Sequence, residues 1–221
     1  MANNYIQAKD FFLSLKPDDR VFWLIRHGTR RHITEGDADK GAHVGLTDEG
    51  RAEAFALGKL FPKSGDAVYF SSPVGRCIET AEQIAAGRET AGGPSASKVN
   101  VMDSLGHYFV RDYDEYLKQL NSHFYQNICN WMYGKDHPAF FPIGPKAEEL
   151  VQMMFEKGTA RFNIFSTHDA WVVPCLGYFC NFEFSPSHWM NYLTGMAIVV
   201  SSSGEKRIIP VTGLSTGNLD F

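Results

Sequence analysis

An unbroken apolar run, Val-Phe-Trp-Leu-Ile, occupies residues 21–25 and constrains the fold more than any other feature. A strand with one face in water alternates apolar and polar residues, whereas a strand covered on both faces is apolar throughout. The run therefore predicts a strand inside a sheet that has helices on both faces. It is followed at once by Arg-His-Gly-Thr-Arg-Arg-His at residues 26–32, a dense group of cationic and titratable side chains.

Strand-like and helix-like segments alternate along most of the chain. We expect further strands at 67–70, 99–102 and 161–165, and helices at about 5–15, 47–60, 72–88 and 146–157. Thr47 and Ser72 are predicted to cap the second and third helices, with Pro73 at the first helical position. Segments 195–200 and 207–211 flank a Ser-Ser-Gly-Glu turn and predict a hairpin. This order predicts a three-layer α/β/α fold around a mostly parallel sheet.

The 221 residues are enough for one sizeable core, so we expect a single domain over residues 1–221. Residues 104–145 differ from the rest because they are rich in aromatic side chains and only partly helical in pattern. We expect them to form a variable cap region, in which most of the aromatic side chains pack in the core rather than bind a ligand.

Composition excludes several classes of function. The formal net charge of −4 argues against general nucleic-acid binding, which requires a basic surface. The N-terminal residues lack the pattern of a signal peptide, and no apolar run approaches the roughly 18 residues of a membrane-spanning helix. The four cysteines lack zinc-site and CxxC spacing, which favours free thiols in a reducing compartment. We therefore expect a cytoplasmic protein with a small-molecule partner; the oligomeric state is left open.

Three of the predicted strands lead into residues that suit phosphate chemistry. The first leads into Arg26-His27-Gly28-Thr29-Arg30, the second into Ser71-Ser72-Pro73 with Arg76 close behind, and the last into Thr167-His168-Asp169. In open α/β sheets, ligands bind outside the carboxyl ends of the strands. If these strands are neighbours, two histidines, three arginines and one carboxylate meet in one pocket.

Each residue type has a role in phosphoryl transfer. A neutral imidazole can attack phosphorus and form a covalent phosphohistidine. Arginine binds phosphate oxygens with two parallel hydrogen bonds, and a carboxylic acid can protonate the leaving oxygen. Gly28 allows the backbone and a ligand to approach closely. His168 or Arg76 alone would more often be structural, so the combination at three strand ends carries the prediction.

The same residues resemble the motifs of the histidine phosphatase superfamily, which has the phosphoglycerate-mutase-like fold. Arg26-His27-Gly28 matches the RHG motif, and residues 46–54 and 71–81 resemble the LTxxG and SSPxxRxxxTA segments. Residues 166–169, Ser-Thr-His-Asp, match the position of the second histidine. The resemblance implies that His27 is the phosphorylated nucleophile, that His168 contacts the phosphoryl group, and that Arg26 and Arg76 clamp it.

The chain shares features with two branches of that superfamily. Arg30 and Asp169 resemble the acid-phosphatase branch, although His32 stands where its RHGxRxP motif has proline. The short length and residues 46–81 resemble the mutase branch, whose acid is a glutamate after the third strand. Asp103 lies in about that region of this chain. Asp169 and Asp103 are thus alternative proton donors, and Asp169 is favoured because it adjoins a predicted pocket histidine.

The expected function is hydrolysis of a small phosphomonoester through a phosphohistidine on His27. Asp169 would supply the proton for the leaving group, and Arg30, Gly28 and Thr29 would contact the substrate. No metal or other cofactor is expected, because the arginines supply the positive charge. His32, Glu35 and Asp37 could ligate a metal, but a solvated loop is the favoured interpretation. A phosphomutase and a catalytically inactive phospho-ligand-binding protein are the alternative functions.

Overall fold

The computed structural model describes residues 3–34, 36–95, 98–120, 123–134 and 136–221. A seven-stranded sheet runs through it in the order β1-β8-β7-β2-β5-β3-β4. Its strands are β1 (Ile6–Gln7), β2 (Arg20–Arg26), β3 (Ala67–Ser71), β4 (Asn100–Val101), β5 (Phe162–Thr167), β7 (Thr194–Val200) and β8 (Lys206–Thr212). Two further strands, β6 (His188–Met190) and β9 (Asn218–Asp220), pair with each other beside it.

Most neighbouring strands of the large sheet are parallel. β2 pairs in parallel with β5, β5 with β3, β3 with β4, and β1 with β8. β7 is antiparallel to both β2 and β8, and β7 and β8 form the predicted hairpin. The predicted α/β fold with a mostly parallel sheet is therefore confirmed.

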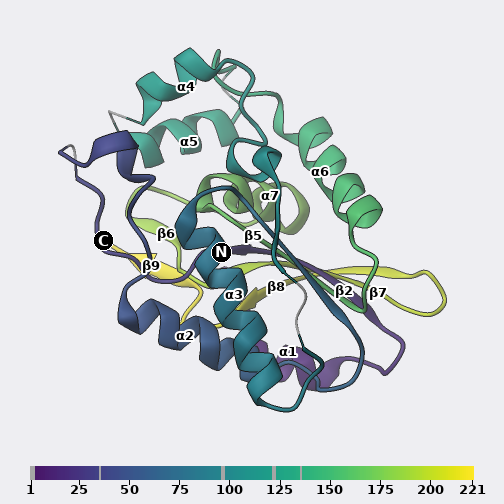
Figure 1. The fold of residues 1–221 in the computed structure, drawn as a ribbon. Helices are drawn as coiled ribbons and strands as arrows, with labels where there is room; N and C mark the ends of the chain where they lie inside the picture. The colour runs from purple at the N-terminus through teal and green to yellow at the C-terminus, as the bar shows by residue number, and fades with distance from the viewer. Residues whose placement is uncertain (1–2, 35, 96–97, 121–122, 135) are drawn as a thin grey trace.

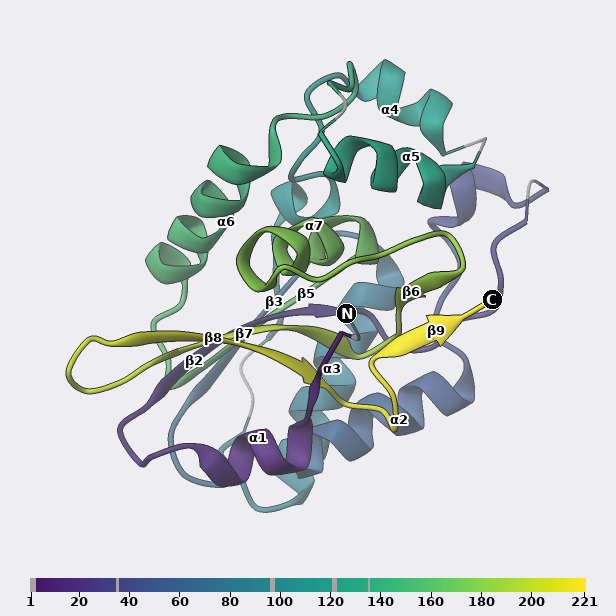
Figure 2. The same ribbon diagram turned by 180° about the vertical axis from the view of Figure 1, so that it is seen from behind.

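Helices cover both faces of the sheet (Figures 1 and 2). On one face lie α1 (Ala8–Ser14), α2 (Asp48–Lys59) and α3 (Gly75–Thr90). On the other lie α5 (Phe124–Met132), α6 (Ile143–Lys157) and α7 (Asp169–Cys180), with α4 (Tyr113–Gln119) farther out. Two short 3-10 helices, η1 (Ala38–Gly41) and η2 (Asp103–Gly106), lie in connecting segments.

The two faces of β2 belong to two separate cores, as its apolar sequence predicts. Val21, Trp23 and Ile25 pack with side chains of α1, α2 and α3. Phe22 and Leu24 pack with side chains of α5, α6 and α7. All five are at most 1% exposed. Because a fully buried large apolar side chain contributes about 1.5–3 kcal/mol, this strand anchors both layers of helices.

The start of α2 is held against the loop that follows β2. Thr47 caps the helix as predicted, with its hydroxyl accepting a hydrogen bond from the N–H of Gly50 at 3.0 Å. A Cβ atom on Gly50 would lie 2.1 Å from the carbonyl oxygen of Thr29, and one on Gly28 would lie 3.1 Å from that of Gly50. Both glycines are therefore required for the close packing of these two backbones.

The predicted start of α3 is wrong. The helix begins at Gly75 with Val74 as its N-cap, not with Ser72 as cap and Pro73 inside. The Ser72 hydroxyl lies 3.2 Å from Nε2 of His168 and also accepts a long hydrogen bond, of 3.4 Å, from the N–H of Val74, so it contacts both the end of the sheet and the residue before the helix. The helix α7, which directly follows β5, was not predicted.

The cysteines are free, and Cys77, Cys129 and Cys175 are buried, as their spacing predicted. No helix within the described residues is long and apolar enough to cross a membrane.

Candidate active site

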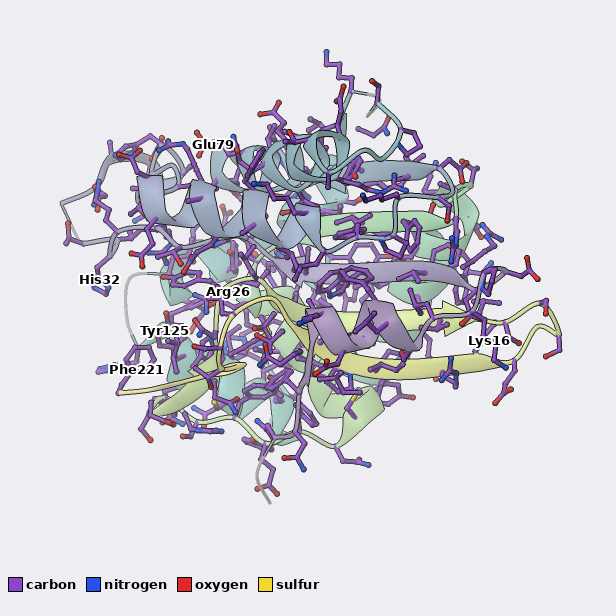
Figure 3. All side chains as sticks on the ribbon, turned by 90° about the horizontal axis from the view of Figure 1, so that it is seen from below. Lys16, Arg26, His32, Glu79, Tyr125 and Phe221 are labelled. Atoms are coloured by element: carbon purple, nitrogen blue, oxygen red, sulfur yellow. The ribbon has the colours of Figure 1, made fainter. Side chains whose placement is uncertain are left out.

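The adjacent strands β2, β5 and β3 bring the predicted residues to one edge of the sheet. Arg26 is paired with Thr167 across β2 and β5, and Ser71 is paired with Ser166 across β3 and β5. His27 and His168 come directly after these paired ends. Figure 3 shows Arg26 at the end of the molecule where His32 and Tyr125 lie, with Lys16 at the opposite end.

A cavity of about 720 Å³ opens at this edge. Five residues predicted from the sequence line it: His27, Arg30, Arg76, His168 and Asp169. The loop after β2 contributes His32, Ile33, Thr34, Asp37 and Lys40, and the cap region contributes Tyr116, Leu120, His123, Phe124 and Tyr125. The cavity thus combines a cationic group at the sheet edge with a largely aromatic wall.

His27 is held as a neutral imidazole with one defined tautomer. Its Nδ1 lies 2.9 Å from the carbonyl oxygen of Gly28, which can only accept, so Nδ1 carries the proton. Nε2 accepts a hydrogen bond from Nε of Arg76 at 3.2 Å. Burial and the charges of Arg76 and Arg26 hold the pKa of His27 well below its usual value. A neutral ring with its electron pair on Nε2 is the nucleophilic form of histidine.

Arg76 lies in the first turn of α3 and contacts three parts of the site. Nε donates to His27, and Nη1 donates to the carbonyl oxygen of Gly41 at 2.9 Å. Nη2 lies 3.5 Å from Nδ1 of His168. The residue is 8% exposed, so its charge acts in a largely desolvated setting.

His168 is also neutral. Since Arg76 can only donate, Nδ1 is the acceptor, and Nε2 donates to the hydroxyl of Ser72. Burial, reinforced by the charge of Arg76, lowers the pKa of His168 to about 3. Its ring centroid lies 5.6 Å from that of His27.

Arg26 forms a buried ion pair with Asp169, whose Oδ2 lies 3.0 Å from its Nη2. Nη1 donates to the carbonyl oxygen of Met190, and the guanidinium lies 4.1 Å from the ring centroid of Tyr192. The Nε atoms of Arg26 and Arg30 are buried without a hydrogen-bond partner among the described residues. An unpartnered buried donor costs about 1–3 kcal/mol, and of these two arginines Arg30 lines the cavity, where an anionic acceptor would satisfy it.

Asp169 is a carboxylate in this setting. Oδ2 accepts from Nε1 of Trp189 at 2.9 Å as well as from Arg26, and Oδ1 accepts from the N–H of Ala170 at 3.0 Å. Burial by itself raises the pKa of Asp169, but the charge of Arg26 and the Trp189 hydrogen bond outweigh it, and the pKa lies below the usual value. A proton donor would need a raised pKa, so the side chain predicted as the acid is in the opposite state.

The family follows from a comparison with known protein families. The model of the histidine phosphatase superfamily (branch 1) matches residues 22–154, which is more than half of the chain. The chain belongs to the histidine phosphatase superfamily. The match includes His27 and Arg76 and ends before His168. No curated protein matches the chain at a significant level.

Solved structures place the chain in the fold of this superfamily. Bacillus stearothermophilus YhfR is 22% identical with a TM-score of 0.56, over 86% of this chain and 95% of that one. A mycobacterial hydrolase is 17% identical with a TM-score of 0.51, over 90% and 100%. Phosphoserine phosphatase from Entamoeba histolytica, in complex with 3-phosphoglyceric acid, is 16% identical with a TM-score of 0.51, over 90% and 96%. At these identities the likeness establishes the fold.

Three residues predicted for the site of this histidine phosphatase superfamily member lie elsewhere. The hydroxyl of Thr29 donates to Glu53 at 2.6 Å, and the N–H of Gly28 donates to the hydroxyl of Thr80 at 2.9 Å. Asp103 lies in η2 and is exposed. Of the described residues that line the cavity, none is Thr29, Gly28, Asp103 or Arg26; Arg26 is buried and pairs with Asp169, which does line the cavity. The first two serve the packing of α2 and α3 behind the site.

Three site residues had no signal in the sequence, and the contact made by a fourth was not predicted. Trp189, Met190 and Tyr192 hold Asp169 and Arg26 from a segment more than 160 residues after β2. Ser72 was predicted as a helix cap, and only the neighbouring position of β5 reveals its contact with His168. Contacts between segments that are far apart in the sequence depend on the order of the strands in the sheet. A local sequence pattern does not predict that order.

Among the described residues, the possible metal ligands on the loop after β2 do not form a metal site. Asp37 forms an ion pair with Arg31 and accepts from the N–H of Thr34 at 2.8 Å. His32 lines the cavity, and Glu35 lies outside the described residues. Within the described part of the chain, no group of three or more His, Cys, Asp or Glu could hold a metal ion.

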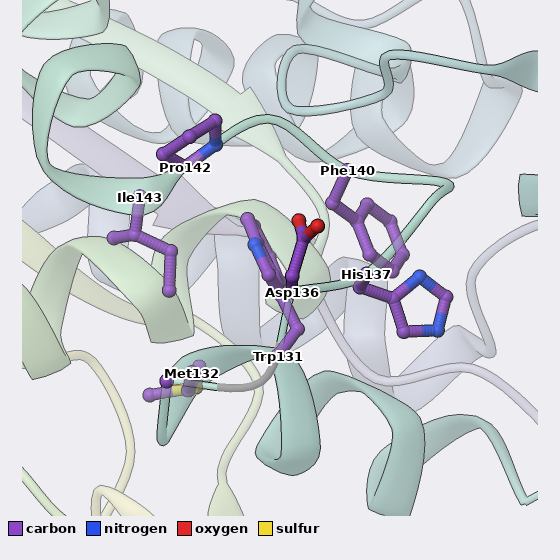
Figure 4. Close-up of a pocket in the computed structure, with 8 residues that line it drawn as sticks. Trp131, Met132, Asp136, His137, Phe140, Pro142 and Ile143 are labelled. Atoms are coloured by element: carbon purple, nitrogen blue, oxygen red, sulfur yellow. The ribbon is translucent and has the colours of Figure 1, made fainter.

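A second cavity, of about 310 Å³, lies in the cap region (Figure 4). It is lined by Trp131, Met132, Gly134, Asp136, His137, Phe140, Pro142 and Ile143. None of the arginines that surround His27 is among these described residues, so this cavity lacks the charge needed to bind phosphate.

Proposed function

We propose that this chain hydrolyses phosphomonoesters through a covalent phosphohistidine on His27. The observation that carries the proposal is the state of His27, a neutral buried imidazole that lines the cavity and whose Nε2 accepts a hydrogen bond from Arg76. The unpartnered Nε atom of Arg30, which also lines the cavity, supports it, because a phosphate oxygen would be its natural acceptor. Phosphatase activity is also the activity named for the Entamoeba histolytica protein with this fold.

The reaction has two displacements. In the first, Nε2 of His27 gives up the hydrogen bond that it accepts from Arg76 and forms a bond to phosphorus, and the bond from phosphorus to the leaving oxygen breaks with its electron pair on that oxygen. The arginines and His168 stabilise the charge on the transferring group. In the second, water adds to phosphorus and the P–N bond returns its electron pair to Nε2. One proton of the water stays on the released phosphate and the other goes to solvent.

Trapping the intermediate tests this function. The protein is mixed briefly with p-nitrophenyl [³²P]phosphate in the presence of EDTA and then denatured. We expect label on the protein that is stable in base and lost in acid, and phosphate released at a steady rate. His27→Ala should lose both. His107→Ala, which changes an exposed histidine outside the cavity, is the matched control and should keep both.

The same experiment separates the alternatives. A phosphomutase would become labelled but would pass the label to a second acceptor molecule instead of releasing phosphate. A phospho-ligand-binding protein would bind vanadate without label or turnover. Phosphate release that persists in His27→Ala would overturn the proposal.

A further inference from the structure

The three hydrogen-bonding contacts that the described residues make with the Asp169 carboxyl group all come from donors. Arg26 and the indole N–H of Trp189 both point to Oδ2, and the N–H of Ala170 points to Oδ1. Asp169 is also the first residue of α7, where the helix dipole favours negative charge. Donors to the carboxyl group stabilise its charged form more than its neutral form, so the surroundings keep Asp169 ionised.

No other carboxyl group of the described cavity lining can replace Asp169 as an acid. Asp37 is the remaining one, and it is ion-paired with Arg31. Burial raises the pKa of Tyr116, which makes its phenol a poorer acid than usual. His32 and His123 also line the cavity but are exposed to solvent, on the loop and the cap. Among the described residues that line the cavity, there is therefore no buried, protonated carboxyl group to meet the leaving oxygen.

The wall of the cavity suits an aromatic leaving group. Tyr116, Leu120, Phe124 and Tyr125 contribute from the cap, and Ile33 contributes from the loop. The ring centroid of Tyr116 lies 5.8 Å from that of Trp171, and Tyr125 lies 4.7 Å from Trp189. Both tryptophans are at most 1% exposed, so the aromatic wall rests on rigid core side chains.

On these grounds we infer that the substrates are aryl phosphomonoesters, whose phenolate leaves without an enzyme-borne proton, and that Asp169 is a positioning residue for Arg26. The inference rests on the proposed phosphatase function. A phenol has a pKa of about 10, so its anion departs readily. An alcohol has a pKa similar to that of water, about 15.7, so an alkoxide must be protonated as it leaves. The phenolate keeps the electron pair of the broken P–O bond and takes its proton from solvent.

The dependence of rate on the leaving group tests this inference. We would measure kcat/KM, which reports the first displacement, for a series of substituted phenyl phosphates and for the alkyl esters glycerol phosphate and O-phosphoserine. We expect kcat/KM to fall steeply as the pKa of the leaving phenol rises. Alkyl esters should be slower by about 10²–10⁴-fold, the usual contribution of a general acid. A flat dependence, with alkyl esters as fast as phenyl phosphate, would overturn the inference.

Variants of the charged and titratable residues test whether Asp169 positions Arg26 or donates a proton to the leaving group. If Asp169 positions Arg26, then Asp169→Asn should lower kcat/KM by the same factor for every leaving group and leave the slope unchanged. If Asp169 donates a proton, the slope should be shallow in the wild type and steep in this variant. Trp189→Phe, which keeps the carboxylate and removes one donor, should also leave the slope unchanged. His32→Asn and His123→Asn should do so as well, and a steeper slope in either would assign the proton to that histidine.

The aromatic wall is tested separately. Phe124→Ala and Tyr125→Ala should raise KM for phenyl phosphate about tenfold or more, while inhibition by vanadate stays within a factor of about two. Tyr178→Ala, at an exposed position on α7, is the control. Equal KM values in all three variants would remove the wall from substrate recognition.

Two further results show whether the substrate is a small molecule or a protein, and whether a negative outcome rejects the proposed function or only the present inference. Free O-phosphotyrosine and a phosphotyrosyl peptide present the same phenyl phosphate, and their kcat/KM ratio separates a small-molecule enzyme from a protein phosphatase. If no phosphohistidine forms on His27, the proposed function fails. If it forms and alkyl esters react as fast as aryl esters, only the present inference fails.

Discussion

Arg76 illustrates how much of this site depends on the geometry of one side chain. Its three nitrogen atoms contact three different elements: His27 after β2, Gly41 in η1 and His168 after β5. The planar guanidinium can reach all three at once because its donors diverge in one plane. It therefore sets the tautomer of His27 and the position of the neighbouring loop together.

Replacing Arg76 by lysine should show that charge alone is not sufficient. An ammonium group keeps the charge but cannot donate to three partners in these directions, so we expect Arg76→Lys to lower kcat/KM by about 10²–10³-fold. Steady-state kinetics with phenyl phosphate measures the effect. Arg51→Lys, a change in partly exposed ion pairs with Asp48 and Glu79 that lie outside the cavity, is the control and should stay within about twofold. A loss of less than about threefold in Arg76→Lys would mean that Arg76 acts only through its charge.

At the scale of helices and strands, α2 and α3 are joined through glycines. A Cβ atom on Gly58 would lie 2.1 Å from the carbonyl oxygen of Ile84, and one on Gly87 would lie 2.0 Å from that of Phe55. The two helix backbones therefore touch directly. This contact fixes α3, which carries Arg76, against α2, which packs on the loop after His27.

Gly87→Ala should separate these helices. The added methyl group has no room at Phe55, so we expect the free energy of unfolding to fall by about 1–3 kcal/mol. That corresponds to a drop in Tm of about 2–4 °C for each kcal/mol in a chain of this size. Because α3 must shift, kcat/KM should fall as well. Calorimetry and kinetics provide the two measurements.

Gly75→Ala is the matched control for that change. It lies in the same helix, and nothing lies within 4 Å of the position of its Cβ. We expect its Tm to stay within about 2 °C of the wild type or to rise slightly. Similar losses in both variants would show that helical glycines of α3 matter for a reason other than contact with α2.

Local sequence patterns predicted the helices and strands better than they predicted the roles of individual side chains. The apolar run of β2 and the cap at Thr47 could be read directly, because each depends on neighbouring residues. The start of α3 could not, because the hydroxyl of Ser72 is used by His168 on another strand. Asp169 was located correctly at the pocket, but its charge state depends on Trp189 and Arg26, which only the tertiary fold brings to it. The helix α7, which follows it, was not predicted because its sequence is apolar on every side and so lacks the alternation of apolar and polar residues that indicates a helix.

At the scale of the whole molecule, two neutral buried histidines make stability depend on pH. In the unfolded chain, His27 and His168 titrate near 6.5, but in the folded protein their pKa values are lowered, for His168 to about 3. Below pH 6.5 the unfolded chain thus binds protons that the folded chain does not. The stability is complete above about pH 6.5 and is lost as the pH falls toward 3.

Urea unfolding at several pH values measures this effect. Each histidine should contribute up to about 1.4 kcal/mol per pH unit, so the free energy of unfolding should fall markedly between about pH 6.5 and 5. The ion pair of Asp169, whose pKa is also lowered, adds to the loss only below about pH 4. His168→Asn should reduce the slope above pH 5, whereas His107→Asn should not. A free energy of unfolding that is constant from pH 7 to 5 would mean that both histidines bind protons equally in the folded and unfolded chain, so that folding does not lower their pKa values.

The place of β2 in the sheet also matters while the chain is being made. β2 ends at residue 26, but its two neighbours, β5 and β7, begin only at residues 162 and 194. At about 5–20 residues per second, ribosomes need about 7–30 s to reach β5. Throughout that time the apolar residues Val21–Ile25 lack the strands that pair with them on either side. Unpaired strand edges are prone to aggregate with strands of other chains. Nascent chains therefore depend on α1, α2 and α3, which emerge first, or on a chaperone, to cover Val21–Ile25 until the sheet can close around it.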